Sequence, residues 1–123
     1  DYSHNIAGGG LIANVDDLLT FGRALQKPGL LSAASLDAIW TPPTVQGVAS
    51  PMSFGWFPRT SPARISISGS NAGTQASLTV WQEPDLVVAV LANSWGRGSR
   101  SGELMDDSRK GLIGKLALAC GVN

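Results

Sequence analysis

Cysteine and histidine are scarce in this chain of 123 residues, which excludes several kinds of site. Cys120 is the only cysteine, so no disulfide can form within the chain, and its apolar surroundings predict a small core residue. A zinc site needs several clustered cysteine, histidine or carboxylate ligands, and the single histidine, His4, lies far from Cys120 in the sequence. We therefore expect no bound metal. No phosphate-binding or dinucleotide-binding glycine motif is present, so we also expect no cofactor.

Charged residues and long apolar runs are sparse as well. Nine basic residues balance nine acidic ones and form no basic stripe, so nucleic acid is not an expected partner. The longest apolar run, Leu86 to Ala92, is far shorter than the roughly 18 to 20 residues of a membrane span. The hydrophobic fraction of 43% is that of a globular chain, and the length suits one domain over residues 1–123.

Helical signals dominate the first third of the chain. Three glycines, Gly8 to Gly10, predict a turn. Asn14 followed by two aspartates predicts the start of a helix, which 27–29 (Lys-Pro-Gly) ends. A second helix is predicted over Ser32 to Trp40, followed by a loop over 41–51.

The second half has the period of strands. Strands are predicted at 54–57, 64–68, 74–81 and 86–92, and a helix at 103–120. This order indicates an α+β (mixed α/β) fold, an antiparallel sheet flanked by helices. One sheet edge would remain exposed, which is a hint that the chain is part of something larger.

No self-contained catalytic centre is evident. The three lysines lie three residues after Ala24, Asp107 and Leu112, so no S-x-x-K is present, and G-x-S-x-G is absent. His4 is the only possible histidine base and lies in a polar turn. The acidic pairs 16–17 and 106–107 are better explained by helix starts or solvated positions than by glycoside hydrolysis.

The order of several short motifs nevertheless suggests a family. The chain resembles the class C β-lactamase and esterase-like serine hydrolases, which are related to penicillin-binding proteins. The matching segments are 7–25 (AGGGLIANVDDLLTFGRAL), 36–42 (LDAIWTP), 54–57 (FGWF), 65–74 (ISISGSNAGT) and 86–93 (LVVAVLAN).

The resemblance implies the C-terminal part of a β-lactamase/transpeptidase-like fold, beside an all-helical region. The parent protein would hydrolyse a lactam, ester or peptide amide through an acyl-serine. A missing first half would carry S-x-x-K and the tyrosine motif, which residues 2–5 (YSHN) do not match. The isolated chain is then expected to be inactive. A periplasmic or secreted location is favoured by the resemblance alone.

One family motif, [KH]-[ST]-G, falls on Ile67, Ser68 and Gly69. The resemblance implies that Ser68, Gly69, Ser70 and Asn71 bind substrate and that their strand supplies an oxyanion-hole N–H. Ile67 departs from the motif, because it holds no charge. Carboxylate recognition is thereby weakened, and ester or peptide substrates, or no substrate, are favoured. Trp56 and Trp95 are expected to pack as aromatic residues rather than line a pocket.

Three interpretations stay open. The chain is part of an enzyme, with a small-molecule or peptide substrate and the missing N-terminal segment as partners. Alternatively, it is a noncatalytic binding or interaction module of the same fold. Or it is a truncated product that self-associates through its open sheet edge.

Overall fold

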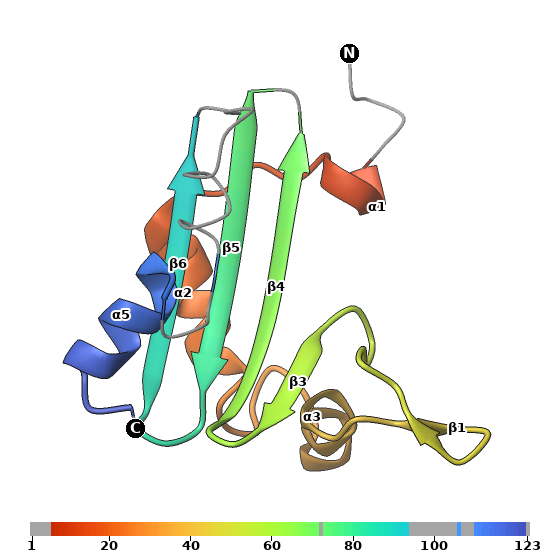
Figure 1. Ribbon diagram of the computed structural model, residues 1–123. Coiled ribbons are helices and arrows are strands. Elements are labelled where there is room, and N and C mark those ends of the chain that lie inside the picture. The colour runs from red at the N-terminus through yellow and green to blue at the C-terminus, as the bar shows by residue number, and fades with distance from the viewer. Residues whose placement is uncertain (1–5, 72, 94–105, 107–109, 123) are drawn as a thin grey trace.

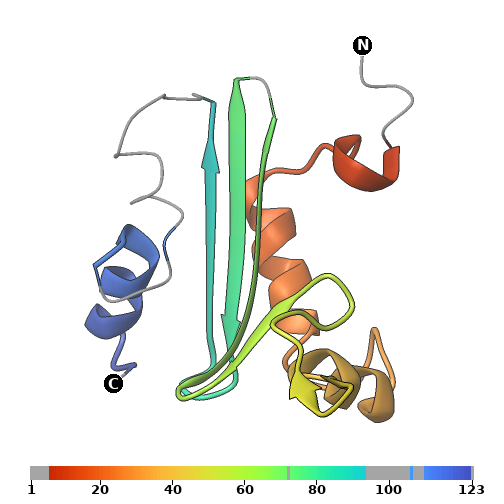
Figure 2. The same cartoon turned by 45° about the vertical axis from the view of Figure 1, so that its right-hand side comes forward.

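A four-stranded antiparallel sheet forms the centre of the chain, and helices pack on both of its faces (Figures 1 and 2). This computed structural model describes residues 6–71, 73–93, 106 and 110–122. The strand order is β3-β4-β5-β6, with each strand antiparallel to its neighbours. The strands are β3 Phe57–Thr60, β4 Ala63–Asn71, β5 Thr74–Trp81 and β6 Leu86–Ala92. The α+β class predicted from the sequence is confirmed.

The helix α2 (Val15–Ala24) begins where the sequence predicts it, because Asn14 caps it in both directions. The Asn14 side chain accepts a hydrogen bond from the Asp17 N–H at 2.9 Å, and the Asn14 N–H donates to the Asp17 carboxylate at 3.2 Å. Ser32 caps α3 (Ala33–Trp40) in the same way, accepting from the Ser35 N–H. Local capping chemistry therefore fixes both starts.

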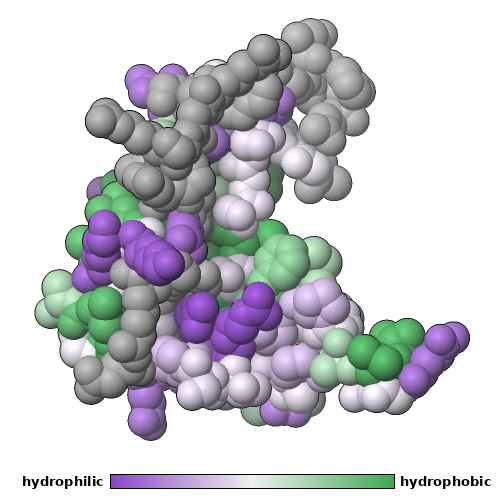
Figure 3. Space-filling view, viewed as in Figure 1, coloured by the Kyte–Doolittle hydropathy of each residue, from purple (hydrophilic) through white to green (hydrophobic). Residues whose placement is uncertain are grey.

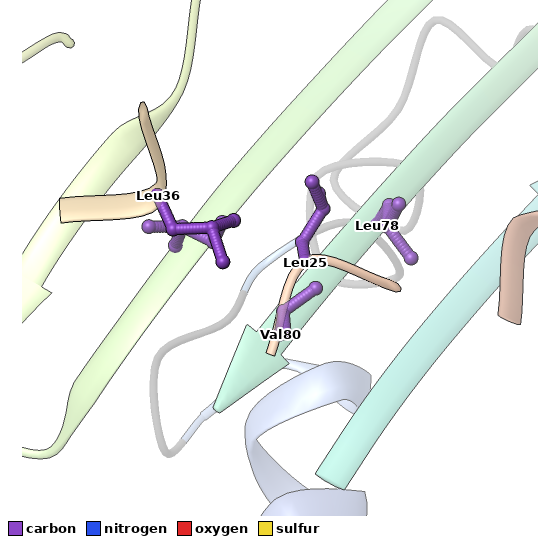
Figure 4. Close-up of a cluster of buried hydrophobic side chains, with 5 residues drawn as sticks. Leu25, Leu36, Leu78 and Val80 are labelled. Atoms are coloured by element: carbon purple, nitrogen blue, oxygen red, sulfur yellow. The ribbon is translucent and has the colours of Figure 1, made fainter. Parts of the chain in front are cut away.

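The first core lies between the sheet and helices α2 and α3. Leu25 and Leu36 meet β4 and β5 there (Figure 4). The Trp40 indole N–H donates to the Leu25 carbonyl at 3.1 Å. The buried members of this cluster, called the α2-side core below, are Leu25, Leu36, Ile65, Leu78 and Val80.

The second core lies on the opposite face, under α5 (Leu112–Ala119). It consists of Trp81, Val88, Ile113, Ala117 and Val122. Because both faces are covered, β5 is buried without interruption from Ser77 to Trp81, although its sequence alternates between polar and apolar residues.

Three predicted segments differ from the observed structure. The predicted loop over 41–51 contains a hairpin of β1 (Thr44–Val45) and β2 (Val48–Ala49). The predicted strand at 54–57 is wrong: Phe54 and Gly55 have φ of 47° and 87°, so they form a turn, and β3 begins at Phe57. The glycine-rich turn near residue 8 contains a single helical turn, α1 (Ile6–Gly9).

The end of the chain also differs. Within the predicted helix 103–120, the described residues before Leu112 (106, 110 and 111) are not helical, and α5 begins at Leu112. The other residues of 103–109 lie outside the described residues, as do His4 and Trp95. Cys120 is exposed, not part of the core, because the chain turns at Gly121 (φ 90°) and Val122 fills the core position instead. No helix within the described ranges is long and apolar enough to cross a membrane.

Candidate functional site

The four residues predicted to bind substrate, Ser68 to Asn71, form the last part of β4. Strand β5 pairs with β4 along this whole stretch, up to Asn71 opposite Thr74. Strand β3 pairs only with Ala63 to Ser66 of β4. Beyond Ser66, therefore, one edge of β4 has no neighbouring strand among the described residues. We call residues 67–71 of this strand the open edge.

Two hydrogen bonds fix the direction of the peptide groups along β4. The Ala63 carbonyl accepts from the Gln82 N–H at 3.3 Å, and the Ile67 carbonyl accepts from the Ser77 hydroxyl at 3.3 Å. Both carbonyls therefore point toward β5. Because peptide groups alternate between the two sides of a strand in an antiparallel ladder, the N–H and C=O of Ser68 and Ser70 point away from β5. No described strand pairs with these groups.

The side chains of the predicted residues do not share one face of the sheet. Ile67 packs against the α2-side core, and alternation along the strand places Gly69 and Asn71 on that same face. Ser68 and Ser70 therefore lie on the α5 side, where both are exposed. The four side chains thus lie on two different faces, and the four residues have in common only that their backbone forms the open edge.

Gly69 borders open space. A Cβ built on it would meet no atom within 4 Å, and its φ is not positive, so the backbone conformation does not require glycine there. By contrast, Gly73, which lies in the turn that leads into β5, has φ of 79° and needs glycine for its conformation. The surface above Gly69 is accessible to a ligand on the α2 side.

Two aromatic residues beside the open edge were not predicted as part of the site. The rings of Phe21 and Trp56 lie 6.4 Å apart at 32°, and Trp56, half-buried, packs against the α2-side core, as Ile67 does. Phe54, in the turn before Trp56, is 80% exposed. In the space-filling view the molecule is hollowed on the side of β4 away from β5, with hydrophobic surface at the lower border of the hollow (Figure 3).

The sequence offered a signal for Phe54 and Trp56, namely the segment 54–57 (FGWF). The glycine in this segment is compatible with a turn as well as with a strand. Because the segment forms a turn, Phe54 is exposed while Trp56 packs against the core. No group of three histidine, cysteine or carboxylate side chains that could hold a metal ion occurs within the described ranges.

Comparison with known proteins identifies the family. The Beta-lactamase family model matches residues 1–107, which is most of the chain and includes all of β4. No curated protein and no solved structure matches the sequence. The predicted resemblance is thus confirmed at the level of the family, together with the hydrolase-like superfamily that it implies. The chain belongs to the Beta-lactamase family, as a serine β-lactamase/penicillin-binding-protein-like domain.

Proposed function

We propose that this chain is the C-terminal part of a serine hydrolase that cleaves a lactam, ester or peptide amide through an acyl-serine. The observation that carries the proposal is the open edge of β4, where the peptide groups of Ser68 and Ser70 point outward. An extended substrate can add to such an edge as a further strand. Ser68, Gly69, Ser70 and Asn71 are then the substrate-binding residues.

The chemistry assigned to the edge is stabilisation of the oxyanion. Acyl transfer places negative charge on the substrate carbonyl oxygen, and backbone N–H groups held in a rigid strand stabilise it without reorganising. The N–H of Ser70 is a suitable donor, since β5 holds the strand in place from the other side. No serine lies three residues before Lys27, Lys110 or Lys115, so the nucleophile and its lysine would come from a preceding segment.

The partner in this proposal is that N-terminal segment. Two large apolar side chains in the segment between α1 and α2 are exposed: Leu11 is 86% exposed and Ile12 is fully exposed. The outer edge of β6 also has no neighbouring strand in the described part of the chain. Further protein would bury these surfaces.

The test compares the chain with its upstream-extended form, using a fluorescent probe that traps acyl-serines. We expect labelling of the extended protein only. Within that protein, Ser70→Pro should abolish labelling, because proline removes the outward N–H, whereas Ser70→Ala keeps the N–H and should be labelled normally. The β4–β5 ladder does not use the Ser70 N–H, so proline is tolerated at this edge position. Labelling of the short chain, or equal labelling of both variants, would contradict the proposal.

A noncatalytic binding module is the second candidate. Ile67, which stands where the family motif has a basic residue, favours it. The discriminating observation is the upstream reading frame: S-x-x-K followed by Y-x-N supports the enzyme, and the lack of both supports the module. Self-association through the sheet edge is a third arrangement, and a monomer mass independent of concentration in light scattering would exclude it.

A further inference from the structure

The two faces of the sheet beside the open edge of β4 differ in chemistry. On the α5 side, the strand presents the hydroxyl groups of Ser66, Ser68 and Ser70. On the α2 side, it presents Ile67 and then the open space above Gly69. Successive groups of an extended ligand paired with this edge would point alternately to these two faces. The ligand is therefore expected to have one side that meets hydroxyls and one side that meets apolar surface.

Apolar side chains lie on the α2 side beside the open edge. Strand β3 pairs with β4 only as far as Phe57 and Ser66, and Trp56, the residue before Phe57, packs against the α2-side core, as Ile67 does. The Phe21 ring lies tilted against Trp56, with 43% of its own surface exposed. These side chains, called the aromatic wall below, are Phe21, Trp56 and Ile67.

Phe54 is an exposed aromatic residue in the turn that leads into Trp56. Its φ of 47° lies in the left-handed region, which is unfavourable for a bulky side chain, and its side chain remains 80% exposed. The turn is closed by two hydrogen bonds between the peptide groups of Ser53 and Trp56, at 2.8 and 2.9 Å, so the positive φ is part of the turn itself.

Along β4, no charged side chain lies on the α2 side, where a carboxylate above Gly69 would need one. Arg64 is the only charged residue of β4, and it lies on the α5 side, opposite Trp81. A carboxylate placed above Gly69 would thus lose hydration without gaining a cation from this strand. An uncharged apolar group would instead bury its surface against the aromatic wall.

We propose that the space above Gly69, bordered by the aromatic wall, binds an uncharged apolar group of the substrate, either an aliphatic acyl chain or an aromatic ring. This inference rests on the proposed function, because it takes the open edge as the substrate site, and it adds the class of group that the site accepts. Ile67 is then a specificity-determining residue: it replaces attraction for a carboxylate by contact with an apolar group.

The test uses two unreactive ligands with the same amide end, N-phenylacetyl-glycinamide and N-succinyl-glycinamide, titrated into the ¹⁵N-labelled chain and followed by nuclear magnetic resonance. We expect the phenylacetyl ligand to bind about tenfold more tightly, as burial of half a ring surface predicts. Its shifts should be largest at the Trp56 indole and the Gly69 amide.

Two variants make the assignment specific. Gly69→Val fills the open space and should remove binding of the phenylacetyl ligand, while Gly29→Val, at an equally open glycine in the loop after α2, should leave it unchanged. Ile67→Lys should reverse the preference toward the succinyl ligand. Circular dichroism and spectral dispersion would verify that each variant is folded.

Equal affinity for the two ligands, tighter binding of the succinyl ligand, shifts centred elsewhere, or no saturable binding at millimolar concentration would overturn the inference. So would binding that survives Gly69→Val. These outcomes differ from failure of the proposed function, which is decided by acyl-serine labelling of the extended protein and requires no preference between these ligands.

Discussion

Replacing Gly22 by alanine should destabilise the chain, although alanine is the better helix former. Gly22 is buried on the face of α2 that meets the sheet. A Cβ at this position would lie 2.5 Å from Val87 Cγ1, 3.3 Å from Leu78 Cδ1 and 3.4 Å from Val80 Cγ2. The nearest atom belongs to a β-branched side chain, which has little rotamer freedom on a strand and cannot swing away.

Two opposing effects set the magnitude. Alanine in a helix interior is favoured over glycine by about 1 kcal/mol. Overpacking of a filled core costs about 2 kcal/mol, the middle of its usual range. The free energy of unfolding should therefore fall by about 1 kcal/mol, which corresponds to a melting temperature lower by about 4 °C for a domain of this size.

The assay is urea unfolding of a double-mutant cycle with Val87→Ala, which removes the clashing methyl groups. In the Val87→Ala background, Gly22→Ala should stabilise the chain by about 1 kcal/mol, because only the helix propensity remains. A Gly22→Ala variant as stable as the wild type, or an equal effect in both backgrounds, would refute the close packing of α2 on β6.

Three further predictions concern single sites. Thr79→Val should raise the free energy of unfolding by about 1 kcal/mol in urea unfolding, because the buried Thr79 hydroxyl has no hydrogen-bond partner among the described residues and valine has the same shape; a loss of stability would indicate that the hydroxyl is satisfied. Phe54→Gly should raise it by about 1 kcal/mol through relief of the positive φ, and should weaken binding of N-phenylacetyl-glycinamide; an unchanged affinity would remove Phe54 from the site. Asn14→Ala should lower the melting temperature through a loss of about 1 kcal/mol, whereas Asn14→Asp keeps the cap and should change it little; equal losses would contradict the capping role.

The elements that the sequence predicted well are those with local causes. The start of α2 depends on Asn14 and Asp17, which lie three residues apart. The strands β5 and β6 were predicted with their bounds because their length and apolar content differ from those of the helices. The segment 54–57 was predicted wrongly, since an aromatic strand and a tight turn share the same composition, and the backbone conformation at Phe54 separates them.

The position of the candidate site stays a prediction, and its geometry could not be predicted from the sequence. The family resemblance pointed to Ser68–Asn71, which are adjacent in sequence. Whether these residues face a partner or solvent depends on the length of β3, and β3 stops pairing at Ser66. The aromatic wall joins α2 to β4 through Trp56, and no spacing along the chain encodes that contact.

By itself, then, the sequence determined the family, the α+β class, the helix caps and the lack of S-x-x-K, because each depends on residue identity or on neighbours within a few positions. The tertiary structure alone decided which edge of β4 is open, which face each side chain takes, and that Gly22 is a close-packing position. These features depend on strand register and on contacts between residues far apart in the chain, such as Gly22 with Val87 and Ser66 with Phe57.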